Sequence, residues 1–335
     1  MTDARKHRRY FEQRISYTGE TRAQAVQCAR ANDADVPLIP PAATFAQADF
    51  EANVLRALGK SMLSGARVGQ PQQLGVDRGA FGIIASLPTR NGLTLVPSRH
   101  PATFSEFVAR LITVYDQAAN TAHGVSGLRL RFTHSNTVLV DTIRGARITI
   151  RGTRKSDWEA AIADNLDEES PSSLRAVVDP DDTSVNDCYI NSDRLNPDIP
   201  QDHVAAHLLS GILRRARLFH TSDELNFVDL WDNTRDDSTE IQVEWSGLLP
   251  HGEVIDRIVD PVFGLAFRFN DTGIFSCVCD PCLYLYYDIP LYHAEEDAVI
   301  HLRRSDLYDA GPSPRKVCQT RGRGPLVDQR MNRWQ

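Results

Sequence analysis

The stretch from Phe263 to Tyr287 constrains the fold most, because it concentrates residues that favour β-strands. Two apolar runs are separated by Asn-Asp-Thr-Gly, and the second run ends at Asp280-Pro281. The aromatic and branched residues suit strands, and the tetrad suits a four-residue hairpin turn. Proline cannot join a ladder in mid-strand, so it marks a second break. The pattern predicts three antiparallel strands, with a fourth from Ala298 to Arg303.

A threonine followed three residues later by Gln or Glu opens three predicted helices, near Thr21, Thr44 and Thr103. In such a capping box the two side chains bond each other's main-chain N–H groups. The helix from Thr103 has the clearest apolar stripe. Its members are Phe104, Phe107, Val108, Leu111, Ile112 and Tyr115.

Strands and helices alternate through the rest of the chain. A basic helix is predicted for residues 5–16, and longer helices for 44–62 and 201–219, with a short one at 253–258. Alternating apolar and polar residues predict the strands. These cover residues 81–86, 93–96, 128–133, 138–140, 147–151, 225–230 and 241–245.

These elements predict an α+β fold with two modules, each combining antiparallel strands with an amphipathic helix, after a helical N-terminal segment. Pro, Ser and Asp gather between the modules, as is typical of a linker. The predicted division is a helical segment at 1–75, a first module at 76–165, an acidic linker at 166–186, a second module at 187–310 and a basic flexible tail at 311–335.

A weak internal echo links the two modules. Ile148-Thr149-Ile150-Arg151 leads to Ser156-Asp157, and Ile300-His301-Leu302-Arg303 leads to Ser305-Asp306. Each segment follows antiparallel strands and has an amphipathic helix upstream. The matching segments are short, so the pattern leaves open whether the modules are related.

Several short motifs occur in a fixed order in the first 165 residues: Tyr17-Thr18-Gly19-Glu20 after an arginine-rich start, Leu38-Ile39-Pro40, Gly124 to Arg129, Ala146 to Ile150, and Trp158 to Ala161. In these motifs the chain resembles a group of uncharacterised actinobacterial proteins. The resemblance implies a shared N-terminal module and no activity, because the motifs mark turns and strand ends.

Charge is distributed unevenly along the chain. Residues 1–16 carry a net charge of +3 and residues 313–335 carry +5, whereas between Asp157 and Glu240 20 acids face six arginines. Complementary charge steers association between proteins. The pattern is consistent with self-association, with a polyanionic partner, or with charged surfaces that only face water.

The N-terminus is basic but lacks the apolar segment of an export signal, and no apolar run approaches the length of a membrane span. We therefore expect a cytoplasmic protein with reduced cysteines and no membrane partner.

Cys277-x-Cys279-x-x-Cys282 is the sharpest local signal for a metal site. The last two cysteines have the spacing of a zinc knuckle, and the first two share one face of a strand. We expect either a structural zinc or, with no cofactor, thiols that pack as small apolar groups. Four residues are candidates for the fourth ligand: Cys188, Cys318, His293 and His301.

Arginines alternate with apolar residues on two predicted strands. Arg129 and Arg131 lie on one, and Arg147 and Arg151 lie two strands further on. The four share one predicted sheet face, which could track phosphates or simply face water. The face lacks the aromatic residues on which single-stranded nucleic acids stack.

The sequence contains no complete motif for nucleotide binding or for a serine hydrolase. Gly59-Lys60-Ser61 mimics the end of a phosphate loop, but Val54 stands where its first glycine belongs. We therefore expect a non-catalytic binding or assembly protein that acts through protein–protein association, including self-association. Nucleic-acid binding by the four arginines is the alternative, and a zinc-containing enzyme or zinc-stabilised module is the second. No catalytic residue is assigned.

Overall fold

The computed structural model describes residues 3–31, 37–59, 79–112, 114–116, 121–165, 203–219, 225–235, 238–247, 251–269, 276–280, 284–294 and 296–305. The predicted linker (166–186) and basic tail (311–335) lie outside these residues. By its contacts the chain divides into two compact units, residues 1–60 with 76–220, and residues 61–75 with 221–335. None of the helices in the described stretches combines the length and hydropathy that a membrane span requires.

The first unit begins with helices α1 (Asp3–Thr18), α2 (Arg22–Ala31) and α3 (Phe45–Gly59). The capping box at Thr21 is confirmed in both directions. The Gln24 amide N–H donates to Thr21 Oγ1 at 3.3 Å, and the Thr21 N–H donates to Gln24 Oε1 at 2.7 Å. At α3 the Gln47 N–H donates to Thr44 Oγ1 at 3.2 Å.

The capping box predicted at Thr103 is wrong. Helix α4 (Pro101–Leu111) begins two residues earlier, and its N-cap residue His100 makes no side-chain cap bond. Proline at the first helical position has a suitable φ and no N–H left unpaired, so it starts the helix before Thr103. Tyr115 is also outside α4, since it belongs to strand β3.

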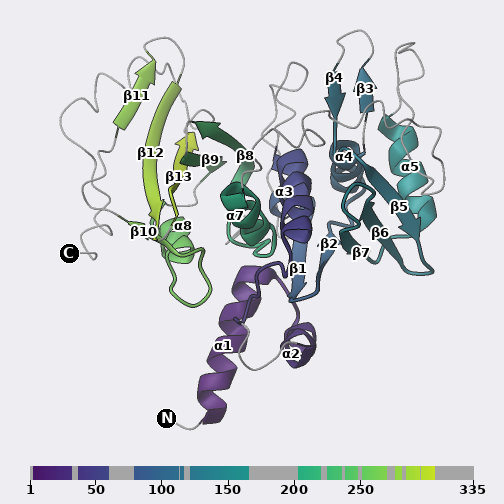
Figure 1. The fold of residues 1–335 in the computed structure, drawn as a ribbon, viewed down its shortest axis with the longest axis horizontal. Coiled ribbons are helices and arrows are strands. Elements are labelled where there is room, and N and C mark those ends of the chain that lie inside the picture. Colours follow the sequence, from purple (N-terminus) through teal and green to yellow (C-terminus); the bar gives the residue numbers. More distant parts are fainter. Residues whose placement is uncertain are drawn as a thin grey trace. The chain divides into compact units, whose positions relative to one another are not determined.

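The sheet of the first unit has the strand order β1-β2-β7-β6-β5 (Figure 1). Strands β2 and β7 are parallel, and the other neighbours are antiparallel. A separate pair, β3 (Val114–Asp116) and β4 (Thr121–His123), lies between α4 and β5 in sequence. The sheet strands are β1 (Ile83–Thr89), β2 (Gly92–Pro97), β5 (Leu128–Phe132), β6 (Asn136–Asp141) and β7 (Arg147–Arg151), after the short helix η1 (Ala80–Gly82).

One face of this sheet is the core side. Its leucines and isoleucines are buried, as are residues of α3, α4 and α5 (Lys155–Asn165), including Phe50, Phe107 and Trp158. Trp158 meets the ring of Phe107 edge-on with centroids 6.4 Å apart. Helix α7 (His203–Leu213) packs on α3 in the same unit. Successive side chains of a strand point to opposite faces, so the residues of β5, β6 and β7 that alternate with the buried ones lie on the other face of the sheet.

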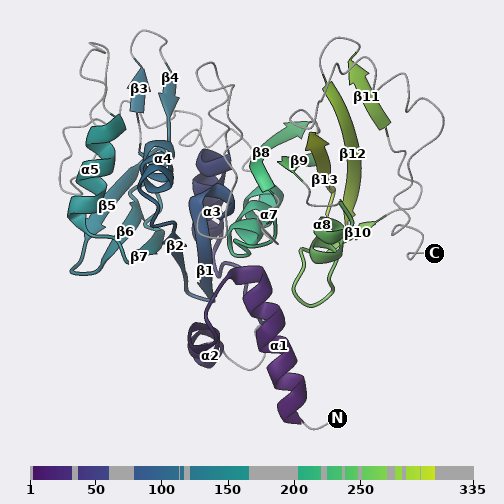
Figure 2. The ribbon, with the colours of Figure 1, turned by 180° about the vertical axis from the view of Figure 1, so that it is seen from behind.

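The second unit is built on a six-stranded sheet, β10-β12-β13-β9-β8, with β11 also paired to β12 (Figure 2). Helix α8 (His251–Ile258) follows β9 and buries Val254 and Ile258. The strands are β8 (Leu225–Arg235), β9 (Ser238–Gly247), β10 (Phe267–Phe269), β11 (Ser276–Asp280), β12 (Tyr284–His293) and β13 (Ala298–Ser305).

The hairpin predicted between the runs around Asn-Asp-Thr-Gly is wrong. Strands β10 and β11 do not pair with each other, because both pair antiparallel with β12 on the same side of it. Phe267 lies opposite His293, and Ser276 lies opposite Asp288, further along β12. The two runs therefore form one interrupted edge strand along β12, and Asp280, the residue before the predicted proline break, lies opposite Tyr284.

The two units repeat one topology. In each, an antiparallel strand pair is followed by a helix and then by further antiparallel strands, of which the last pairs parallel with the second: β2 with β7, and β9 with β13. The sheet orders β1-β2-β7-β6-β5 and β8-β9-β13-β12-β10 therefore correspond strand by strand.

The register also matches the sequence echo. Ile148 and Ile300 occupy equivalent positions. Each lies between a buried residue of the parallel neighbouring strand (β2 or β9) and a buried leucine of the antiparallel neighbouring strand (β6 or β12). The equivalent cross-strand rows are Leu93–Ile148–Leu139–Leu130 and Ile241–Ile300–Leu291–Phe269. The echo is thus a structural correspondence over the whole sheet.

Candidate binding surface

Strand register brings the four predicted arginines together on one face of the first sheet. Arg129 and Arg147 lie in one cross-strand row, with Val140 between them. Arg131 lies in the next row, opposite Val138. Arg147 and Arg151 both point to the face opposite the buried Ile148 and Ile150, because they alternate with them along β7. We call Arg129, Arg131, Arg147 and Arg151 the arginine face.

The arginine face carries positive charge that no acid of the described residues pairs with. Arg131, Arg147 and Arg151 are exposed and Arg129 is half-buried. Among the described residues none of the four forms an ion pair, and Arg129 Nη1 donates only to the carbonyl of Leu128, at 3.0 Å. Between the arginines lie uncharged residues: Asn136, Val138, Val140 and Thr149. Arginines among uncharged residues are typical of protein interfaces.

Helix α2 covers the other half of the same sheet face. Cys28 of α2 packs with Ala85 and Leu87 of β1, and Val96 of β2 completes this cluster. Among the described elements α2 covers this face at β1 and β2, so its open part is the stretch over β5, β6 and β7.

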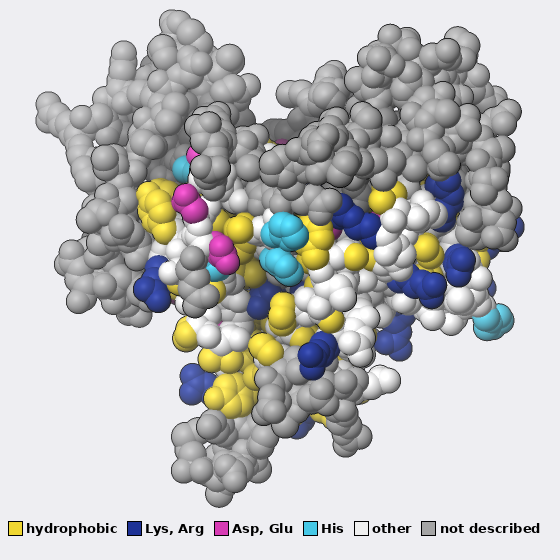
Figure 3. Space-filling model, in the orientation of Figure 1, with side chains coloured by type: hydrophobic (Ala, Val, Ile, Leu, Met, Phe, Trp, Pro, Cys, Tyr) yellow, Lys and Arg dark blue, Asp and Glu magenta, His cyan; other side chains and the backbone are white. Residues whose placement is uncertain are grey.

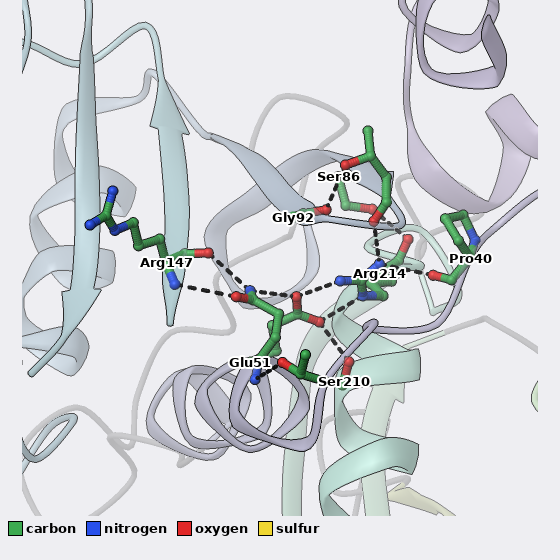
Figure 4. Close-up of polar contacts among 10 residues, drawn as sticks. Pro40, Glu51, Ser86, Gly92, Arg147, Ser210 and Arg214 are labelled. Atoms are coloured by element: carbon green, nitrogen blue, oxygen red, sulfur yellow. Dashed lines mark hydrogen bonds and ion pairs between the residues drawn. The ribbon is translucent and has the colours of Figure 1, made fainter. Parts of the chain in front are cut away.

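The half-buried side chain of Gln47 holds the edge of the arginine face in place. Gln47 Nε2 donates to the Arg147 carbonyl at 2.9 Å, and the Arg147 N–H donates to Gln47 Oε1 at 3.2 Å. Gln47 Nε2 also donates to Glu51 Oε1 at 2.9 Å. Figure 4 shows the Arg147 side chain directed away from these hydrogen bonds, so its main chain is fixed while its guanidinium points away from Gln47.

Glu51 and Arg214 form the centre of a buried polar group to which Gln47 bonds. Both side chains are fully buried, and Arg214 donates from Nε and Nη2 to the two carboxylate oxygens, each at 2.7 Å (Figure 4). Ser210 adds a hydroxyl donor to Glu51 at 2.6 Å. Arg214 Nη1 donates to the carbonyls of Pro40 and Thr89, both at 2.9 Å. With its hydrogen bonds satisfied, the pair ties α3, α7 and the sheet together as a structural group.

A second buried pair, Arg14 and Glu20, lies beside Cys28. Its bonds are 2.6 Å and 2.7 Å long, and Arg14 Nη2 also donates to the Pro88 carbonyl at 3.1 Å. Burial, with help from the Glu20 carboxylate, raises the pKa of the Cys28 thiol to about 12. Cys28 is therefore an unreactive thiol at neutral pH.

The predicted zinc ligands cannot be compared with the structure. Cys277 and Cys279 lie in β11, whose backbone alone is described, and Cys282 lies outside the described residues. Within the described side chains, no group of three His, Cys, Asp or Glu residues could hold a metal ion. The zinc site stays a prediction.

Histidine side chains gather on the surface over α3 and α7 (Figure 3). His203 and His207 are exposed, and the His203 ring lies 4.0 Å from the Phe45 ring, centroid to centroid. Arg144 lies over the same ring at 5.2 Å and pairs with Asp49. Stacking on Phe45 and the Arg144–Asp49 ion pair thus occupy the first turn of α3 and the start of α7 with structural contacts.

Sequence reasoning missed acidic residues on the corresponding face of the second sheet. Asp229 of β8 lies opposite Glu244 of β9, and Glu240 lies four residues before Glu244 on the same strand. Ile241 and Val243 alternate with them and are buried. Period-two alternation could have placed these acids on one face, but the charge count ended at Glu240 and took no account of strand faces.

Comparison with known proteins gives no relative: no family model, no curated protein and no solved structure matches this chain.

Proposed function

We propose that this protein acts by binding an acidic protein partner on the arginine face. The observation that supports this most is the placement of four arginines, without ion pairs among the described residues, together on the open part of a sheet face. Guanidinium groups bind carboxylates through paired hydrogen bonds, and their charge speeds association. The uncharged residues between them provide surface that a protein partner can bury.

Nucleic-acid binding is the second candidate, because the same arginines could contact phosphates. The face is less suited to single strands, since the described residues of its open part include no exposed aromatic side chain for base stacking. A duplex needs no stacking, so it is the appropriate nucleic-acid probe.

The test uses labelled poly-glutamate and a labelled DNA duplex with the full-length protein. Fluorescence anisotropy measures binding before and after the change of Arg129, Arg131, Arg147 and Arg151 to Ser. Poly-glutamate binding should weaken by about tenfold or more in this variant, because several charge-assisted hydrogen bonds are lost. Salt should weaken the binding of the intact protein.

A matched control removes the same charge elsewhere. Changing the exposed residues Arg8, Arg9, Arg22 and Lys155 to Ser should leave poly-glutamate binding nearly unchanged. Equal losses in both variants would mean that net charge, not the arginine face, is responsible. Tight duplex binding without poly-glutamate binding would instead establish the second candidate.

A further inference from the structure

The second sheet carries a surface that complements the arginine face. On β8 and β9 the side opposite the buried core presents three acids, Asp229, Glu240 and Glu244, all half-buried. Between them, in one cross-strand row, lie Trp231, which is half-buried, and Gln242, which is buried. We call Asp229, Glu240 and Glu244 the acidic face.

The acidic face is topologically equivalent to part of the face that bears the arginines. The register that aligns Ile148 with Ile300 also aligns Thr94 of β2 with Gln242 of β9. The same sheet face is thus basic on β5 and β7 in the first unit and acidic on β8 and β9 in the second, where Arg303 of β13 lies opposite Glu244. One chain carries both halves of a charge-complementary contact.

Charge spacing also agrees between the two faces. Arg147 and Arg151 are four residues apart on β7, with Thr149 between them. Glu240 and Glu244 are four residues apart on β9, with Gln242 between them. Four residues of β-strand span about 13 Å, so each arginine of one pair can meet one glutamate of the other. Both central residues are uncharged and add no repulsion.

Glu244 would be stabilised in its charged form by such a contact. Burial raises the pKa of this carboxyl, and the nearby Arg303 only opposes the shift. A second guanidinium from a partner would stabilise the charged form further.

We propose that the arginine face of one copy binds the acidic face of a second copy, so that the protein assembles with itself. This inference rests on the proposed function, because it names the acidic partner of the arginine face. The contact joins two different surfaces, so it builds a ring if the rotation between successive copies closes, and an open chain if it does not.

The test measures mass by analytical ultracentrifugation on the full-length chain. The intact protein should associate, and the dissociation constant should rise by about tenfold or more between low and high salt, since surface charges are screened. A variant with the four arginines changed to Ser should be monomeric. So should a second variant with Asp229→Asn, Glu240→Gln and Glu244→Gln.

Mixing the two variants gives the decisive result. Each retains one intact face, so the mixture should form a one-to-one complex that neither forms alone. No complex in the mixture, or association in either variant alone, overturns the proposal. The single change Arg147→Glu serves as a milder variant if a multiple change fails to fold, and it should weaken association of the intact protein by about tenfold.

The failure of self-association can be separated from failure of the proposed function. If the intact protein is monomeric at every salt concentration, the second-copy proposal is wrong. Retained poly-glutamate binding would then show that the arginine face takes a different acidic protein, whereas loss of both would remove the proposed function as well.

Discussion

Gln47 and Arg147 exchange two hydrogen bonds, from the side chain of one to the main chain of the other. Arg147 begins β7, one residue before the Leu93–Ile148 pair at which the pairing with β2 starts. The Gln47 amide therefore takes the place of a neighbouring strand. Because Gln47 also bonds Glu51, the arginine face is anchored to the buried core.

Gln47→Ala should loosen the start of β7. Each lost hydrogen bond contributes about 1 kcal/mol, so the Arg147 amide should exchange with solvent at least about fivefold faster. Hydrogen exchange measured by NMR checks this. Gln24→Ala, which removes a glutamine from the α2 cap, should leave the Arg147 amide unaffected; equal exchange in the native protein and Gln47→Ala would contradict the anchoring role.

Glu51→Gln should destabilise the first unit strongly. The variant keeps the shape of the side chain but leaves the buried Arg214 charge without its carboxylate, which typically costs about 3–5 kcal/mol. Urea unfolding measures the change in the free energy of unfolding.

Glu12→Gln is the control for Glu51→Gln. Its partner Arg8 lies on the same helix, and both side chains are more than half exposed, at 68% and 62%. Exposed pairs of this kind contribute less than about 1 kcal/mol. Similar losses in the two variants would show that burial of the Glu51–Arg214 pair is not the cause.

Cys28 should make stability depend on alkaline pH. In the folded protein the pKa of the Cys28 thiol is raised to about 12. The stability that the neutral thiol contributes is therefore complete below the pKa of the unfolded thiol, and it is lost as pH rises from there towards 12. The stability advantage over Cys28→Ala should fall by about 1.4 kcal/mol for each pH unit in that window. Urea unfolding of both proteins at several alkaline pH values tests this, and a constant difference would contradict a raised pKa.

Gly19 and Gly145 provide a matched pair of glycines. Both have positive φ, +75° and +73°, but a Cβ at Gly19 would lie 2.3 Å from the Ile84 carbonyl oxygen, whereas Gly145 has no atom within 4 Å. Gly145→Ala should cost about 1–2 kcal/mol from backbone strain alone. Gly19→Ala should cost about 3–5 kcal/mol, because α1 must also move away from β1.

Thermal and urea unfolding of the two alanine variants measures this difference. Equal losses would mean that the close approach of Gly19 to Ile84 is absent in solution.

The sequence by itself determined the class of fold and most elements. Local signals were sufficient for this: the Thr21 and Thr44 caps, the apolar stripe of α4 and the alternation along β7 are properties of residues close together in the chain. The shared face of the four arginines also followed, because alternation fixes which side of a strand each residue occupies.

Only the tertiary structure decided which strands are neighbours. The parallel pairing of β2 with β7 joins residues far apart in sequence. Strand β12 pairs with both β10 and β11, whereas the local turn residues favoured a hairpin between β10 and β11. The burial of Glu51 against Arg214 depends on α7 packing on α3, across 163 positions of the chain. Such pairings are set by the packing of whole faces, which no local pattern of residues contains.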